Sequence, residues 1–234
     1  MSERFFLDAA PRGGRALLAG DEARHLARVL RAAIGDEVRV FDGTGCEWVA
    51  RVAAIGRDEV TLEVVGELPA APAADRPVTL AVALPKGERQ KWLVEKLTEL
   101  GAARLVPLVT ERGVAEATPA ALDRLRRGVV EACKQCGRTR LMEIGGPATI
   151  AEACAAATPG GRVILCDPAG PPLVARAIGP AAAVLGLVGP EGGFTAGEVA
   201  AAEAAGAVRA RLGPHVLRVE TAAIALAAWL TPGS

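Results

Sequence analysis

The sequence predicts an α/β protein in which a small antiparallel β domain precedes a larger, largely parallel sheet with helices on both faces. Residues 37–65 hold three short β-type runs separated by turns, and residues 67–77 are rich in proline and alanine. After residue 78, apolar runs of strand length alternate with helical segments, which is typical of parallel sheets. We therefore expect a β domain over 1–70, a linker over 71–77 and an α/β domain over 78–234.

The amino-terminal part contains one helical segment before its strands. In "DEARHLARVLRA" (21–32), Leu26, Val29 and Leu30 stand at helical spacing, with arginines elsewhere around the turn. The turns "DGTG" and "GRDE" then divide the β-type runs that follow. This order predicts one short helix packed beside antiparallel strands.

The α/β part has a regular alternation. The strand-like runs are 78–84, 104–109, 162–166, 182–188 and 208–212. In the helical segment 88–100, Leu93, Leu97 and Leu100 form one stripe, and Lys91, Glu95 and Glu99 form a charged ladder. We expect these helices to cover a buried parallel sheet.

A C-x-x-C motif lies in the helical segment 119–138. Cys133 and Cys136 continue the apolar stripe of Leu122, Leu125 and Val129. No second C-x-x-C pair exists to complete a metal site. We interpret both cysteines as buried structural thiols, and redox chemistry is the alternative.

The composition indicates which broad class of protein the chain belongs to. The chain has 234 residues, of which 51% are hydrophobic, and no apolar run is long enough to cross a membrane. The first residues lack the pattern of a secretory signal, and the five cysteines are sparse and odd in number. We therefore expect a cytoplasmic protein with reduced thiols and no metal.

The charge is uneven along the chain although the net charge is zero. Residues 86–140 contain 12 basic and 7 acidic side chains, whereas residues 1–70 contain 9 and 12. A basic middle segment is typical of a surface that meets nucleic acid, and a solvated helical face is the alternative.

A glycine-rich stretch, "LVGPEGGFTAGE" (187–198), joins a strand to a helix. It matches neither the Walker loop, which needs a lysine, nor the Rossmann glycine spacing. Thr195 and Glu198 form a capping box, so the helix satisfies its own first amides. Glu191 would repel a phosphate at this position. The loop favours a ligand without phosphates whose positive charge tolerates Glu191, and a plain tight turn is the alternative.

Several motifs together resemble one family. "LVGPEGGF" and "RLGPHVLRVETAAIALAAWL" (211–230) are similar to the carboxyl-terminal signature of the RsmE family of 16S ribosomal RNA methyltransferases. Residues 85–114, 131–140 and 21–38 resemble further blocks of that family, so the likeness covers essentially the whole chain. His215 and Val219 stand where the family has arginine and threonine, and the latter puts one side-chain contact in doubt.

This resemblance implies a fold, a cofactor and a reaction. The fold would be a trefoil-knotted SPOUT domain after a PUA-like barrel, and the reaction methylation of uridine N3 in the 16S RNA of the small ribosomal subunit. S-adenosylmethionine would lie on three loops, with main-chain groups of Leu187, Gly189, Leu212 and Leu217 at its adenine and ribose. The cofactor-binding residues expected by position are Leu165, Cys166, Leu187, Val188, Gly189, Pro190, Glu191, Gly192, Gly193, Leu212, Gly213, Val216, Leu217 and Arg218.

The reaction needs a group that favours the N3 anion of the uracil ring. The catalytic candidates are Arg218 and Glu220, with Arg138 and Lys86 from the basic middle segment. We favour Arg218 as electrostatic stabiliser over Glu220 as base, and an ion pair of Arg218 with Glu220 or Glu191 is the structural alternative. We expect RNA contacts from Arg4, Arg15, His25, Arg28, Arg31, Lys86 and Arg138, although His25 fits an ordinary surface histidine equally well. The family implies a homodimer, and the helix 221–230 is either its interface or a buried helix.

Three other functions remain open at this point. The chain fits a non-catalytic RNA-binding protein of ribosome assembly or a SPOUT methyltransferase that acts on another RNA. A metabolic enzyme with an anionic cofactor fits less well, because the glycine loop has no lysine or arginine to pair with a phosphate.

Overall fold

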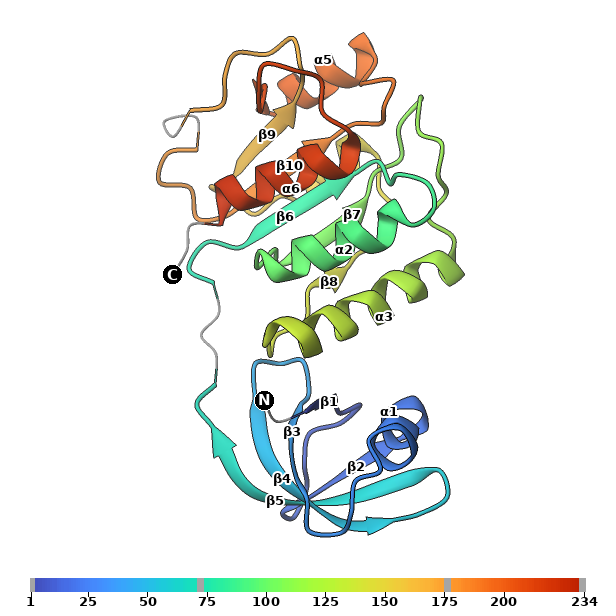
Figure 1. The fold of residues 1–234 in the computed structure, drawn as a ribbon. Coiled ribbons are helices and arrows are strands. Elements are labelled where there is room, and N and C mark those ends of the chain that lie inside the picture. The colour runs from blue at the N-terminus through green and yellow to red at the C-terminus, as the bar shows by residue number, and fades with distance from the viewer. Residues whose placement is uncertain (1–2, 71–73, 175–177, 232–234) are drawn as a thin grey trace. The chain divides into compact units, whose positions relative to one another are not determined.

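A computed structural model describes residues 3–70, 74–174 and 178–231. Its contacts divide the chain into two compact units. The small unit contains Met1–Ala73 together with Cys133–Leu141, and the large unit contains Ala74–Ala132 and Met142–Ser234 (Figure 1). The division therefore differs from the expected boundaries, because Cys133–Leu141 packs with the small unit. Part of the expected linker, residues 71–73, lies outside the described residues.

The small unit is built on a five-stranded sheet with the order β1-β3-β4-β5-β2. The strands are β1 (Arg4–Phe6), β2 (Arg15–Ala19), β3 (Glu37–Phe41), β4 (Glu47–Ile55) and β5 (Glu59–Leu68). The antiparallel pairing of β3, β4 and β5 confirms the prediction for this region. Alternate residues of β2 and β4 are buried, so one face of the sheet covers an apolar core that includes Phe5, Leu18 and Leu62.

The predicted helix of the small unit is shorter and less regular than its spacing indicates. Helix α1 (Gly20–Arg24) continues as a π-helical turn, η1 (His25–Val29), in which the Leu30 amide bonds the His25 carbonyl at 3.0 Å. This wider turn changes the direction of the side chains that follow, so Leu26 is buried whereas Val29 is 70% exposed. The expected stripe of Leu26, Val29 and Leu30 is therefore wrong.

The large unit contains a six-stranded sheet with the order β11-β9-β10-β6-β7-β8. Every pairing in it is parallel, which confirms the predicted sheet. The strands are β6 (Val78–Val82), β7 (Arg104–Pro107), β8 (Glu143–Ile144), β9 (Arg162–Cys166), β10 (Val184–Val188) and β11 (Val208–Ala210). Strand β10 lies between β9 and β6, although β7 and β8 come between them in the chain. All five residues of β10 are buried, as expected for a central strand covered on both faces.

Helices cover both faces of this sheet. They are α2 (Arg89–Glu99), α3 (Pro119–Cys136), α4 (Ile150–Ala155), α5 (Ala196–Ala204) and α6 (Val219–Leu230). Ile150 of α4 and Ala202 of α5 share an apolar cluster with residues of β9 and β10. Helix α6 packs on the other face, against α2, β6 and β10 (Figure 1). A Cβ at Gly186 would lie 2.4 Å from Leu226 Cδ2, so glycine is what lets α6 approach β10 so closely.

The two cysteines of the C-x-x-C motif differ in burial. Cys133 is fully buried, whereas Cys136 is exposed, so the prediction of two buried thiols holds for the first alone. Cys136 is the last residue of α3, and Gly137 follows it with a φ of 86°. Cys136 therefore lies in the last turn of α3, where its side chain is exposed. None of the helices formed by the described residues has the length and apolarity needed to span a membrane.

Candidate functional site

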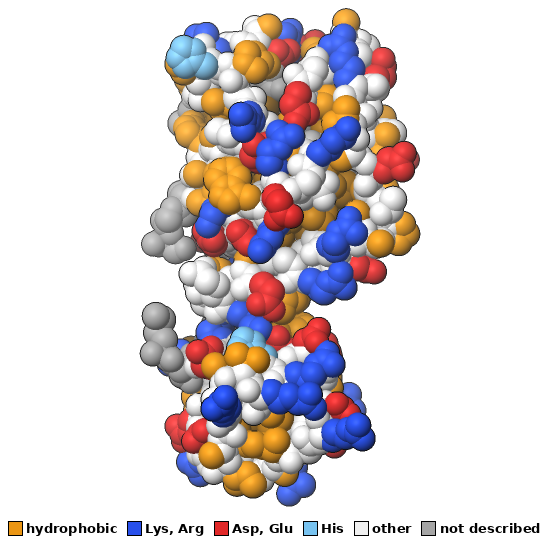
Figure 2. Space-filling model, turned by 45° about the vertical axis from the view of Figure 1, so that its right-hand side comes forward, with side chains coloured by type: hydrophobic (Ala, Val, Ile, Leu, Met, Phe, Trp, Pro, Cys, Tyr) orange, Lys and Arg blue, Asp and Glu red, His pale blue; other side chains and the backbone are white. Residues whose placement is uncertain are grey.

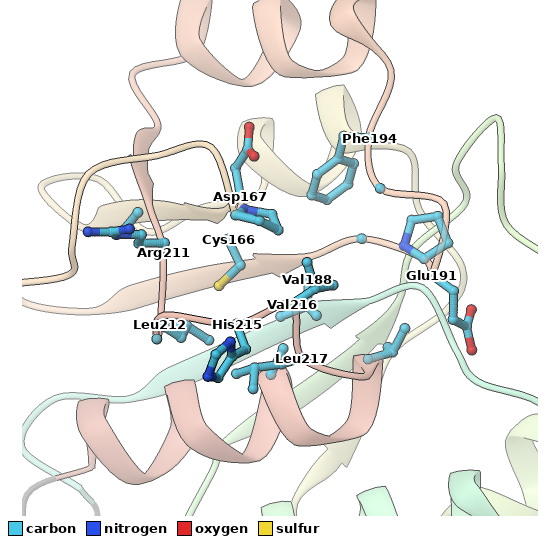
Figure 3. A pocket seen from close by; sticks show the side chains of 18 residues that line it. Cys166, Asp167, Val188, Glu191, Phe194, Arg211, Leu212, His215, Val216 and Leu217 are labelled. Atoms are coloured by element: carbon cyan, nitrogen blue, oxygen red, sulfur yellow. The ribbon is translucent and has the colours of Figure 1, made fainter.

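A cavity of the large unit opens where β9, β10 and β11 end. Because these strands are parallel, the three segments that follow them meet at one edge of the sheet. The cavity encloses about 780 Å³ with its open mouth included. Its lining comes from residues 166–168, residues 188–194 and residues 210–222 (Figure 3). A cavity at the carboxyl ends of parallel strands is in the usual position for a small-molecule site.

The cavity wall is mainly apolar. Its two carboxylates, Asp167 and Glu191, each pair with an arginine that is not part of the lining. Burial raises the pKa of Cys166 to about 12, so this thiol stays neutral. Asp167 accepts a hydrogen bond of 2.7 Å from Arg209, and Glu191 pairs with Arg89 at 3.1 Å. In Figure 3 the Glu191 carboxylate lies at the edge of the view, away from Cys166. Glu191 is therefore paired with an arginine of its own chain, whereas the sequence suggested that a positively charged ligand would lie near it.

The glycine loop after β10 makes a tight turn. The Gly193 amide bonds the Pro190 carbonyl at 2.8 Å, and Gly193 has a φ of 68°, which favours glycine. A Cβ on Gly189 would lie 3.0 Å from Phe194 Cε2, so a side chain at this position would displace the ring that lines the cavity. Glycine is therefore needed for two different reasons in this loop.

The start of helix α5 is closed by its own side chains. The Glu198 amide donates to Thr195 Oγ1 at 3.3 Å, and the Thr195 amide donates to Glu198 Oε2 at 2.7 Å. This is the predicted capping box, and it is confirmed. Glu111, after β7, adds a hydrogen bond of 3.0 Å with the Thr195 hydroxyl. The first amides of α5 are thus partly satisfied without a ligand.

The start of helix α6 is different. Its N-cap residue, Arg218, makes no side-chain cap hydrogen bond and is exposed, between Leu217 and Val219, which both line the cavity. The main-chain amides of Leu212 and Leu217 have no main-chain acceptor among the residues that the structure describes. Two main-chain donors beside the cavity are therefore without a main-chain acceptor among the described residues, and the exposed Arg218 directly follows one of them in the chain.

Glu220 does not line the cavity. Its side chain is 6% exposed, and its Oε2 lies 3.7 Å from Arg89 Nη1. The structural alternative for Arg218, an ion pair with Glu191 or Glu220, is absent from the contacts that the structure describes, because Arg89 pairs with both carboxylates. This placement argues against Glu220 as a base, since its carboxylate faces a cation of α2 and is hidden from a substrate.

The structure brings most of the expected cofactor-binding residues to the cavity wall. The lining contains Cys166, Val188, Gly189, Pro190, Glu191, Gly193, Leu212, Gly213, Val216 and Leu217. Leu165, Leu187, Gly192 and Arg218 are not part of it. The Leu165 and Leu187 side chains belong to the apolar cluster that includes Ile150 of α4 and Ala202 of α5, which leaves their main chain alone to face a ligand.

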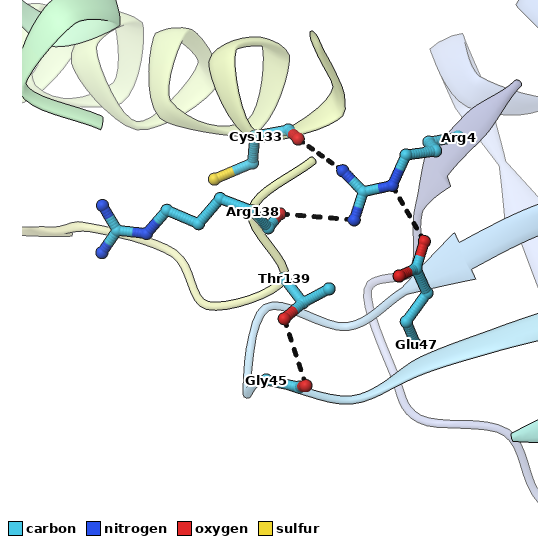
Figure 4. A network of polar contacts seen from close by, with 6 residues as sticks. All are labelled: Arg4, Gly45, Glu47, Cys133, Arg138 and Thr139. Atoms are coloured by element: carbon cyan, nitrogen blue, oxygen red, sulfur yellow. Dashed lines mark hydrogen bonds and ion pairs between the residues drawn. The ribbon is translucent and has the colours of Figure 1, made fainter. Parts of the chain in front are cut away.

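The residues expected to contact RNA fall into two groups. Arg15, Arg28, Arg31 and Lys86 are exposed. Arg4 is held by Glu47 at 2.9 Å and by the carbonyl of Cys133 at 2.6 Å, so its role is structural (Figure 4).

His25 and Arg138 are half-buried. His25 meets the ring of Phe5 edge to face, with the ring centroids 6.0 Å apart. The Arg138 Nε donates to the Arg140 carbonyl, which favours a local role for this side chain. Figure 2 shows Lys and Arg side chains on the surfaces of both units, with Asp and Glu side chains between them.

Sequence reasoning missed several residues at the site. Asp167, Phe194 and Arg211 line the cavity, and Arg89 and Arg112 bond the glycine loop from outside it. Both arginines lie in the stretch 85–114, whose likeness to the family was the one available signal. Asp167 directly follows β9, where a polar residue at a strand end is a further signal.

Comparison with known proteins identifies the family. The model of the RNA methyltransferase domain matches residues 72–231, and that of the RNA methyltransferase PUA domain matches residues 18–65. The chain belongs to the RsmE family of RNA methyltransferases. Ribosomal RNA small subunit methyltransferase E of Mycobacterium bovis is 35% identical, with 94% of this chain and 87% of the relative aligned. The enzyme of that name from Synechocystis is 36% identical over 86% of this chain and 67% of the relative.

Solved structures of two relatives share the fold. A methyltransferase from Legionella pneumophila has a TM-score of 0.89 at 28% identity, with 98% of this chain and 97% of that chain covered. Ribosomal RNA small subunit methyltransferase E from Neisseria gonorrhoeae has a TM-score of 0.87 at 28% identity, with 98% and 96% covered. Both were solved with S-adenosylmethionine. The expected fold class, a SPOUT-type α/β domain after a PUA-like β domain, is confirmed.

Proposed function

We propose that this protein transfers the methyl group of S-adenosylmethionine to N3 of one uridine, position 1498, in the 16S RNA of the small ribosomal subunit. The observation that carries the proposal is the cavity at the ends of β9, β10 and β11, in a chain that shares its fold with two S-adenosylmethionine-bound relatives. The names of the curated relatives support ribosomal RNA of the small subunit as the substrate.

The residues of the cavity fit this cofactor. The neutral Cys166 thiol, Val188, Phe194 and Leu217 offer an apolar surface to an adenine ring. The free main-chain amides of Leu212 and Leu217 offer donors to its ring nitrogens. The described lining also contains Glu191, whose negative charge suits a ligand without phosphates. S-adenosylmethionine, when bound, supplies an electrophilic methyl group.

Arg218 is the side chain that we propose acts on the uracil. N3 of uracil is a weak acid that is mostly protonated near neutral pH, and the neutral ring is a poor nucleophile. A fixed cation beside the cavity favours the N3 anion without a separate base. Arg218 is exposed and lies in the chain between two residues that line the cavity, and neither Glu191 nor Glu220 pairs with it. Its guanidinium would therefore be available to the developing negative charge.

RNA binding is assigned mainly to the small unit. Arg15, Arg28 and Arg31 are exposed and offer phosphate contacts, which position an RNA without reading its sequence. Lys86 offers a further phosphate contact from the large unit. We propose the domain boundaries of the sequence analysis with Cys133–Leu141 added to the small unit.

We also propose that the protein acts as a homodimer in the cytoplasm. Leu226 and Leu230 of α6 are fully buried inside the unit, whereas Trp229 is 41% exposed. Trp92, on the adjoining helix α2, is 43% exposed. Two large apolar side chains on neighbouring helices favour an interface between two copies of the chain.

The proposal is tested by methyl transfer to small subunits purified from cells that lack this protein. Tritiated S-adenosylmethionine should label the 16S RNA, and mapping should locate the methyl group on N3 of one uridine. Label on another nucleotide would assign the protein to a different RNA target. Cofactor binding without any transfer would favour a non-catalytic role in ribosome assembly.

A further inference from the structure

One guanidinium joins two of the segments that form the cavity. Arg89, the first residue of α2, places its Nη1 3.1 Å from Glu191 Oε1 and 3.7 Å from Glu220 Oε2. Glu191 belongs to the glycine loop after β10, and Glu220 to the first turn of α6. The Arg89–Glu191 contact spans 102 residues of sequence. A single nitrogen atom thus links the loop to the helix.

The two carboxylates depend on Arg89 to different degrees. The Glu191 side chain is 42% exposed, so water screens its pair with Arg89. The Glu220 side chain is 6% exposed, and its Oε2 has no hydrogen-bond donor within the described residues. A buried carboxylate without a donor is unfavourable unless a cation lies close to it. Glu220 therefore fixes where the Arg89 guanidinium lies, and Arg89 in turn holds Glu191.

A second arginine holds the next residue of the loop. Arg112 Nη1 donates a hydrogen bond of 2.7 Å to the Gly192 carbonyl. A Cβ on Gly192 would lie 3.3 Å from Arg112 Cδ, so the loop main chain lies directly against this side chain. Consecutive residues, Glu191 and Gly192, are therefore bound by two arginines from different parts of the chain.

We propose that Arg89 is a positioning residue that sets the glycine loop against α6 and so shapes the cofactor cavity. This inference rests on the proposed function. Arg89 does not line the cavity; it acts through Glu191, which does. Small displacements of such a loop weaken binding strongly, because every contact to the ligand depends on the same main chain.

The test compares full-length Arg89→Ala with the matched control Arg104→Ala. The Arg104 side chain is 40% exposed against 39% for Arg89, and it pairs with Glu143 at 3.2 Å in the same unit, outside the cavity lining. Calorimetry gives the Kd for S-adenosylmethionine, and amide hydrogen exchange follows residues 187–193. Arg89→Ala should raise the Kd about tenfold or more and speed exchange in this segment. Arg104→Ala should change neither.

Two further variants separate positioning from general destabilisation. Arg89→Lys keeps the charge and should recover most of the cofactor affinity. The double variant Arg89→Ala/Glu191→Gln should bind the cofactor no more weakly than Arg89→Ala, because Arg89 acts through Glu191. Unchanged exchange at residues 187–193 in Arg89→Ala would overturn the inference. A wild-type protein that binds no S-adenosylmethionine would instead contradict the proposed function, while the exchange measurement still decides the role of Arg89.

Discussion

Arg4 donates a hydrogen bond of 2.6 Å from Nη1 to the main-chain carbonyl of Cys133, 129 residues further along the chain (Figure 4). Its Nε also bonds Glu47 at 2.9 Å, and its guanidinium lies 4.8 Å from the ring centroid of Phe41. Thr139 adds a hydrogen bond of 3.1 Å to the Gly45 carbonyl. These contacts make Cys133–Leu141 part of the small unit.

The first prediction concerns this network. Arg4→Ala removes a charged donor that is 11% exposed, and leaves the Cys133 carbonyl and the Glu47 carboxylate without it. We expect the free energy of unfolding to fall by about 2 kcal/mol, measured by urea denaturation. Arg15→Ala, at an exposed position, is the control and should change it little. A fall of equal size in both variants would mean that the Arg4 contacts contribute no stability of their own.

The network also bears on truncation. A fragment of residues 78–234 would retain Cys133–Leu141 but lose its partners Arg4, Gly45 and Glu47. The sequence assigns residues 78–234 to one α/β domain, because the proline-rich stretch before residue 78 is the one boundary that its composition indicates. No local sequence pattern indicates that the last residues of α3 belong to the small unit.

The fold was predictable where local pattern and burial agree. Strand β9 matches the expected run 162–166 residue for residue, because a strand buried on both faces is a continuous apolar run. Strands β1 and β8 have three and two residues and depend on pairing with distant strands, so no periodicity indicates them. The π-helical turn was missed because Leu26, Val29 and Leu30 fit an α-helix equally well.

The functional site was likewise predictable where its pattern is local and was missed where it depends on contacts between distant residues. The capping box of Thr195 and Glu198 is local, and its pattern was sufficient to predict it. The glycine loop was recognised for the same reason, and the family resemblance assigned it a ligand. Arg89 and Arg112 were missed because their partners, Glu191 and Gly192, are 102 and 80 residues away. Contacts at such separations are fixed by topology, which a single sequence does not display.

A second prediction concerns Gly189. In Gly189→Ala the added methyl group would lie 3.0 Å from Phe194 Cε2, so the ring must move within the cavity wall. We expect the Kd for S-adenosylmethionine to rise about tenfold while the protein stays folded by circular dichroism. Gly146→Ala is the control, because a Cβ at Gly146 meets nothing within 4 Å. Equal Kd values in Gly189→Ala and the wild type would show that the loop does not bind the cofactor.

A third prediction concerns pH. Burial raises the pKa of Cys133 to about 11 and that of Cys166 to about 12, from an ordinary value of 9.0. Above pH 9 the unfolded chain loses the protons of these two thiols, whereas the folded chain keeps them until the pH approaches the folded-state pKa values. The stability from these thiols is therefore complete below pH 9 and is lost as the pH rises through the folded-state values.

The unfolding free energy should accordingly decrease from pH 9 to pH 11, measured by urea denaturation at each pH. Thiol labelling with peptide mapping gives an independent measurement at pH 8. The exposed Cys136 should react quickly and the buried Cys133 slowly in the folded protein, and the half-buried Cys166 should react more slowly than Cys136 because its pKa is raised. Labelling of Cys166 as fast as that of Cys136 would contradict a neutral thiol in the cavity wall.

A fourth prediction concerns the salt dependence of RNA binding. If Arg28 and Arg31 contact phosphates, each contact releases counterions when the complex forms. Replacing either by alanine should lower the slope of log K against log salt by about 0.7 to 0.9. Arg4→Ala is the control, because its guanidinium is held inside the small unit and should leave the slope unchanged. An unchanged slope in both exposed variants would remove them from the RNA surface.

The last prediction separates chemistry from binding. Arg218 and Arg31 are both exposed arginines, so a general electrostatic account predicts the same loss for each. If Arg218 stabilises the N3 anion at the cavity mouth, Arg218→Ala should reduce turnover at saturating RNA far more than it reduces RNA affinity. Arg31→Ala should weaken RNA binding and leave that turnover nearly intact. Steady-state kinetics on purified small subunits, at two salt concentrations, distinguish the two patterns. A loss of affinity in both variants, with full turnover in Arg218→Ala, would show that the reacting uracil lies away from Arg218.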